Sequence, residues 1–98
     1  NEWNDGLGLR LAELDAKLRR QLKLEEGLLV REANGAARSE GIRPGDLVMA
    51  VNDQRVARVD DFRAAVQRLP RDRSAALLIM RNLRLIYVPV ATVGAPRP

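Results

Sequence analysis

The chain has 98 residues, 46% of them apolar and 3% aromatic, and its 17 Lys and Arg outnumber its 13 Asp and Glu to give a net charge of +4. This length suits one small domain, and the apolar content is too high for a disordered segment. The sequence has no Cys, no His and no apolar run of about 18 residues, which argues against disulfides, zinc sites, histidine catalysis and a membrane-spanning helix.

The first third of the chain predicts two strands with a short helix between them. Residues 1–5 are polar and are expected to form a frayed lead-in. The alternation typical of a half-buried strand is carried by Leu7, Leu9 and Leu11. Asp15 is placed to cap a helix with one apolar face, formed by Leu14, Leu18 and Leu22. Residues 25–27 then predict a turn and residues 27–33 a second strand.

The middle of the chain predicts a turn that leads into a buried strand. Residues 34–41 favour one or two helical turns that end at Gly41 in a left-handed conformation. Pro44 and Gly45 occupy the second and third places of a type II turn. The apolar run over 47–51 then predicts a strand buried on both faces, followed by a hairpin corner at 52–53 and a returning stub over 54–56.

The last third predicts the main helix and a hairpin. The helix is expected over 60–69, with Asp60 and Asp61 at its start and Pro70 as its stop. Its buried stripe consists of Phe62, Ala65, Val66 and Leu69. Residues 75–81 and 84–90 predict two strands around a turn, and residues 91–98 a tail or linker. Together these elements predict a mainly β domain (β-rich α+β) with five to six short strands and two to three helices.

Nothing in the chain predicts catalysis. The hydroxyl groups have no His to activate them, and they belong to Ser39, Ser74, Tyr87 and Thr92. The adjacent carboxylate pairs at 25–26 and 60–61 suit a solvated turn and a helix start, since paired catalytic carboxylates face each other across a cleft. No loop offers the converging oxygens of a cation site. We therefore expect a non-catalytic domain without a metal or another cofactor.

The basic residues are mostly Arg and are spread along the chain without aromatic side chains between them. This pattern is typical of a soluble Arg-rich surface, and we expect no nucleic-acid partner. Binding to DNA or RNA is kept as an alternative of a different class, and a salt-sensitive gel shift would reveal it.

One feature at the start of the chain indicates binding. The segment from Gly6 to Leu9 alternates glycine and leucine immediately before a predicted strand. Glycine tolerates unusual backbone angles, so successive N–H groups can turn inward to hold an anion, and a strand edge beside them can accept a peptide. A plain turn is the alternative explanation, and the helix that begins at Asp60 could form the other wall of such a groove.

Several segments in this order resemble a PDZ domain, and most closely the C-terminal PDZ domain of bacterial DegP/HtrA serine proteases. The resemblance is carried by Leu7-Gly8-Leu9, Gly41-Ile42-Arg43-Pro44-Gly45-Asp46, Val51-Asn52-Asp53-Gln54 and the capped helix from Asp60. It covers about residues 6–90, between the lead-in and the tail. It implies a partly open β-barrel or sandwich with the circularly permuted bacterial strand order. Asp53 and Leu83 stand where the family often has Gly, which puts the shapes of two loops in doubt.

The resemblance also implies a peptide site. Its residues would be Leu7, Gly8, Leu9, Arg10, Leu11, Val59, Arg63 and Val66. The first three match the loop that binds a terminal carboxylate, the next two the strand that pairs with the peptide, and the last three the helix face beside the groove. Leu7, Leu9 and Val66 would also line the pocket for the last side chain of the peptide. Core packing is the alternative role of the apolar members. Arg63 would either narrow the pocket or select acidic side chains in the peptide.

By the same resemblance, the chain would be the peptide-binding module of a periplasmic HtrA-type serine endoprotease. It would capture apolar C-termini of unfolded proteins by strand addition and regulate the attached protease. Expected partners are C-terminal or extended peptide segments, the protease domain, a first PDZ domain and other copies in an oligomer, without membrane insertion. Since the sequence starts at Asn1 and not at Met, we expect a piece of a longer protein. Two alternatives stay open: a blocked groove used for oligomer assembly, or a parent that is another protease or a secretion protein.

Overall fold

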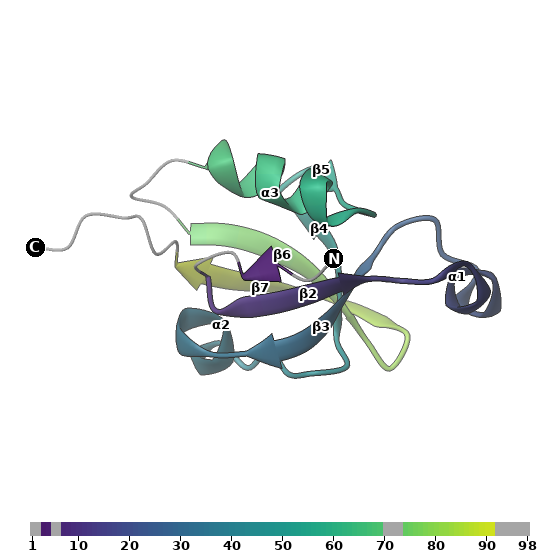
Figure 1. Ribbon diagram of the computed structural model, residues 1–98. Coiled ribbons are helices and arrows are strands. Elements are labelled where there is room, and N and C mark those ends of the chain that lie inside the picture. Colours follow the sequence, from purple (N-terminus) through teal and green to yellow (C-terminus); the bar gives the residue numbers. More distant parts are fainter. Residues whose placement is uncertain (1–2, 5–6, 70–73, 92–98) are drawn as a thin grey trace, which may run out of the picture.

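The computed structural model describes residues 3–4, 7–69 and 74–91, with the backbone alone for residues 3–4 (Figure 1). Seven strands and three helices occur in this part of the chain. In chain order they are β1 (Trp3–Asn4), β2 (Leu9–Glu13), α1 (Ala16–Leu22), β3 (Leu28–Ala33), α2 (Gly35–Ser39), β4 (Leu47–Val51), β5 (Gln54–Arg55), α3 (Val59–Gln67), β6 (Ser74–Arg81) and β7 (Arg84–Ala91).

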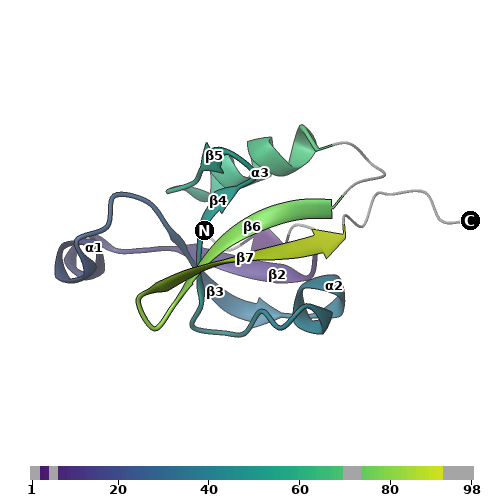
Figure 2. The same cartoon turned by 180° about the vertical axis from the view of Figure 1, so that it is seen from behind.

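The strands form one open sheet in the order β1-β2-β3-β4-β6-β7, with the two-residue β5 paired to β4. Every neighbouring pair is antiparallel. The longest pairing joins β6 and β7, and seen from behind this hairpin lies between α3 above and α2 below (Figure 2). The predicted mainly β class with up to three helices is confirmed.

Most of the predicted elements form where their local signals place them. The Asp15 side chain caps α1 by accepting a hydrogen bond of 2.7 Å from the backbone N–H of Leu18. β4 is buried at every position, as its uninterrupted apolar run predicts. The turn before it has Gly45 at a φ of +96°, and the backbone N–H of Asp46 bonds to the carbonyl of Arg43 over 3.1 Å. This geometry agrees with the type II turn.

The main core lies between the sheet and α3. Phe62, at 0% exposure, is its largest side chain, and it is surrounded by buried residues of β2, β3, β4, β6 and β7. A second, smaller cluster lies under α1 and contains Leu14, Leu47 and Met49. Loss of a fully buried Phe side chain costs a protein about 3–5 kcal/mol, so Phe62 contributes strongly to the packing of α3 on the sheet.

The start of α3 differs from the prediction. The helix begins at Val59, so the residue at the N-cap is Arg58 and not Asp60. Asp61 supplies the cap from inside the first turn, because its Oδ2 accepts hydrogen bonds from the backbone N–H groups of Ala57 (3.1 Å) and Arg58 (3.0 Å). The helix ends at Gln67, two residues before the predicted end, and Pro70 lies outside the described residues.

The lead-in is the largest departure from the prediction. Trp3 and Asn4 were expected to fray with the rest of residues 1–5, but the structure pairs them as β1 with β2. An unpaired strand edge presents a row of free N–H and C=O groups, which is a template for a further strand whatever its side chains are. At the other end, β7 continues to Ala91, and residues 92–98 of the predicted tail lie outside the described part.

Candidate functional site

The loop before β2 is held against the start of α2. The Gly8 carbonyl accepts a hydrogen bond of 2.7 Å from the backbone N–H of Asn34, and the Leu7 carbonyl accepts one of 3.1 Å from Ala37. Gly8 has a φ of +95°, and a Cβ atom there would lie 1.9 Å from the carbonyl oxygen of Asn34. Only glycine fits at this position, because any side chain would collide with backbone atoms.

The leucines of this region point into the protein. Leu7, Leu9 and Leu11 are each at most 1% exposed and belong to the main core. None of the three side chains is open to solvent in this structure. Leu7 and Leu9 also take part in further interactions within the chain. Gly6, the first residue of the predicted loop, lies outside the described residues.

Helix α3 contacts β2 and carries the three helix positions of the predicted site. Val59 is buried in the main core, Val66 is half-buried against it, and Arg63 is exposed. The predicted helix positions therefore divide into two that pack against the core and one charged residue at the surface. Arg63 has an interaction partner within the chain.

A hydrogen bond that the sequence did not predict joins β2 and α3. The backbone N–H of Val59 donates a hydrogen bond of 3.0 Å to Oε2 of Glu13, which ends β2. The acceptor satisfies one of the free N–H groups at the start of α3 and fixes that end of the helix to the strand. An acidic residue at the end of a predicted strand is too common to signal such a link 46 residues along the chain.

Both edges of β2 are paired. β3 occupies one edge, with a register shift between Arg10 and Leu11. β1 occupies the other edge, where Trp3 lies opposite Leu11 and Asn4 opposite Arg10. The Arg10 side chain makes an ion pair with Glu32 on β3, and both side chains are about half exposed. Exposed pairs of this kind contribute little to stability, so this one chiefly orients Arg10.

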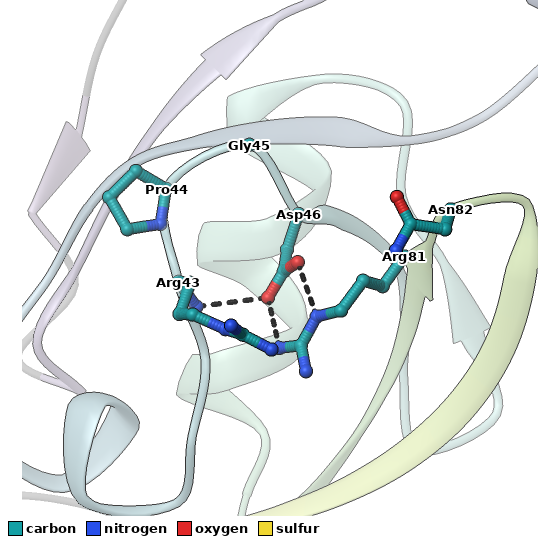
Figure 3. Close-up of a pocket in the computed structure, with 6 residues that line it drawn as sticks. All are labelled: Arg43, Pro44, Gly45, Asp46, Arg81 and Asn82. Carbon is teal, nitrogen blue, oxygen red and sulfur yellow. Dashed lines mark hydrogen bonds and ion pairs between the residues drawn. The ribbon is translucent and has the colours of Figure 1, made fainter.

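The Arg43–Asp46 turn contains the one buried acidic side chain among the described residues (Figure 3). Asp46 Oδ2 accepts hydrogen bonds from the Arg43 backbone N–H (2.9 Å) and from Arg81 Nη2 (2.6 Å), and its Oδ1 accepts one from Arg81 Nε (2.8 Å). Arg81 Nη2 also donates to the Gly41 carbonyl over 2.8 Å. The carboxylate therefore ties the turn to β6.

Burial and bonding act in opposite directions on this carboxylate. Burial raises the pKa of Asp46, but the hydrogen bonds from Arg81 and Arg43 and the positive charge of Arg81 outweigh it, so the net pKa is lowered. The hydrogen bond to Asp46 in turn raises the pKa of Arg81. Both carboxylate oxygens already accept hydrogen bonds from the protein. We therefore assign the pocket lined by these residues a structural role and do not treat it as a candidate binding site.

The described residues contain no group of three or more acidic side chains that could hold a metal ion. In the same part of the chain, no helix is long and apolar enough to cross a membrane.

Comparison with protein families gives a match over residues 29–81 to a family described as "PDZ domain". Among curated proteins, the chain is similar to a "Probable periplasmic serine endoprotease DegP-like" of Pseudomonas putida (strain GB-1), at 30% identity over 83 residues. It is also similar to the protein of that name in Pseudomonas fulva (strain 12-X), at 32% identity over 83 residues. Each alignment covers 84% of this chain but 17% of the relative, so the chain spans about a sixth of their length.

Two solved structures share the fold. The HtrA-type protease AlgW with a decapeptide has a TM-score of 0.73 at 23% identity, covering 99% of this chain and 30% of that one. The HtrA3 PDZ domain bound to the phage-derived ligand FGRWV has a TM-score of 0.72 at 19% identity, covering 93% of this chain and 84% of that one.

Proposed function

Because this chain belongs to the PDZ domain family, we propose that it binds a C-terminal or extended segment of another protein between β2 and α3. The family match covers more than half of the 98 residues. PDZ domains bind peptides by adding them as a strand to a sheet edge. The observation that supports the proposal is the geometry of Gly8, whose φ of +95° and hydrogen bond from the Asn34 N–H fix the loop immediately before β2.

In this proposal the backbone of the loop binds the ligand. The N–H groups of Leu7, Gly8 and Leu9 would donate to the terminal carboxylate, and each charge-assisted bond would contribute about 1.5–3 kcal/mol. Arg10 and Leu11 would pair with the peptide backbone. These five residues form one continuous segment, and hydrogen bonds from the N–H groups of Asn34 and Ala37 hold its first two residues at the start of α2.

The α3 side would supply selectivity. Val59 and Val66 would contact apolar side chains at the end of the peptide, since both belong to the apolar face of the helix. Arg63 is exposed on the same helix, so its charge would favour acidic side chains further upstream in the peptide.

The parent protein would be a DegP-like periplasmic serine endoprotease, as the names of the similar curated proteins suggest. This domain would capture apolar C-termini of unfolded proteins and regulate the attached protease. The protease domain, a first PDZ domain and the other copies in an oligomer would then be its partners, and the periplasm its location.

A second candidate function has the same fold but does not involve peptide binding. Such a domain would serve oligomer assembly while its groove stays blocked. The pairing of β1 with the outer edge of β2 favours this alternative, because that edge is the one a peptide would use.

Peptide titrations with two charge variants of α3 test the proposal. The probe is FGRWV, which the HtrA3 PDZ domain binds. The 98-residue chain is expected to bind it with a micromolar Kd, or about 8 kcal/mol. Val66→Glu places a charge on the half-buried side of α3 and should weaken binding at least about tenfold, because burying an unpaired charge is costly.

Ala64→Glu is the matched control, because it adds the same charge to the same helix at an exposed position. Its Kd should stay within about twofold of the unchanged chain. Circular dichroism of both variants verifies that they are folded. Equal weakening by the two variants would argue against the groove.

A further inference from the structure

Two residues ahead of the loop already use the strand edge that the proposed peptide needs. β1 is antiparallel to β2 and places Trp3 opposite Leu11 and Asn4 opposite Arg10. On its other side β2 is paired with β3 along its whole length, from Leu9 to Glu13. At Arg10 and Leu11, therefore, both edges of the strand are occupied by the chain itself.

The overlap with the proposed site is direct. Arg10 and Leu11 are the strand residues expected to pair with a peptide, and both pair with β1. Figures 1 and 2 place β1 on the side of β2 toward α3, which is the side where the peptide would lie. A strand of this sheet can pair with one neighbour on each edge, so β1 and a peptide exclude each other at these two positions.

We infer that Trp3–Asn4 is an intramolecular competitor for the peptide site, and that a ligand pairs with β2 only after β1 has been displaced. This inference rests on the proposed function. The segment Trp3–Asn4 would then have a regulatory role. A contact elsewhere in the longer protein that displaces this segment, or holds it on β2, would change the affinity of the domain for peptides.

The size of β1 sets how strong the competition is. β1 has two residues, whereas β6 and β7 pair over eight residues each. A contact this small is reversible. It is also tethered, since only residues 5–9 separate Asn4 from Arg10 in the sequence, and a short tether keeps the local concentration of the displaced segment high.

Competition by a tethered segment multiplies the intrinsic affinity by the fraction of molecules in which the edge is open. If β1 is docked in about nine molecules of ten, its removal lowers the Kd about tenfold. Docking of β1 in about two thirds of the molecules would give about threefold, and docking in all but about one in thirty would give about 30-fold, so we expect a change between these limits.

The test compares binding of FGRWV by four forms of the chain, measured by calorimetry. One is the 98-residue chain, and a second lacks residues 1–4. A third carries Trp3→Gly and Asn4→Gly, which keeps the length but weakens strand formation, and it decides the question if the shortened chain does not fold. The fourth lacks residues 95–98 and controls for the loss of four residues away from β1.

A Kd about 3- to 30-fold lower without residues 1–4 or with the two glycines, and an unchanged Kd without residues 95–98, would support the inference. Binding by those two variants alone would support it most strongly. One Kd for all four forms, or weaker binding without β1, would overturn the inference and leave the proposed function standing. No binding by any form up to about 1 mM would overturn both.

Discussion

Replacing Gly8 with alanine tests how the carboxylate loop is built. The added Cβ would lie 1.9 Å from the carbonyl oxygen and 2.7 Å from the carbonyl carbon of Asn34. Both are backbone atoms and cannot rotate away, so the loop or the start of α2 has to move. Movement would break the hydrogen bonds that the carbonyls of Leu7 and Gly8 accept, each worth about 1 kcal/mol.

The backbone angle adds to this cost. A φ of +95° is strained for alanine by roughly 1–2 kcal/mol. We therefore expect Gly8→Ala to lower the free energy of unfolding by about 3 kcal/mol, against a total of about 5–15 kcal/mol for a typical domain. Urea unfolding followed by far-UV circular dichroism measures the difference.

Gly45→Ala separates the two contributions. Gly45 has nearly the same φ, +96°, but no atom lies within 4 Å of an added Cβ. Gly45→Ala should therefore lower the free energy of unfolding by only about 1 kcal/mol, from the backbone angle alone. If the free energy of unfolding falls by the same amount in both variants, the close approach of Asn34 is not the reason why the loop requires glycine.

Two further predictions concern the Asp46–Arg81 pair and the β6–β7 turn. Asp46→Asn should cost about 2 kcal/mol at pH 7, because it removes the negative charge that neutralises Arg81, whereas Glu32→Gln in an exposed pair should cost under about 0.5 kcal/mol. Since folding lowers the pKa of Asp46, its contribution is present above the ordinary value of 3.8 and lost as the pH falls below it, so a difference that persists unchanged in urea titrations at pH 3 would contradict this account. Leu83 has a φ of +64° and is 77% exposed, so Leu83→Gly relieves backbone strain without loss of packing and should raise the Tm by about 4–8 °C in a thermal melt. A lower Tm would refute that reasoning.

Local signals in the sequence predicted most of the fold. The Asp15 cap, the turn at Pro44 and Gly45 and the buried strand over 47–51 each depend on residues close together in the chain, and the structure forms all three. The pairing of Trp3–Asn4 with β2 could not be predicted in this way, since two residues are too few to show a periodic pattern.

The tertiary contacts around the candidate site could not be predicted from the sequence. The glycine–leucine alternation marked the loop, but the reason for Gly8 is the approach of Asn34, which is distant in sequence. The bond between Glu13 and Val59 and the pair of Asp46 with Arg81 likewise join residues 46 and 35 positions apart. Such contacts arise from tertiary packing and leave no pattern in a single sequence.

The central claim is that backbone N–H groups at the start of β2 hold the terminal carboxylate of a peptide. Calorimetry with FGRWV and with the same peptide amidated at its C-terminus tests it most directly, because the two ligands differ only in that group. Loss of one charge-assisted hydrogen bond predicts a Kd at least about tenfold higher for the amide. Equal affinity of the 98-residue chain for the two peptides would contradict the claim.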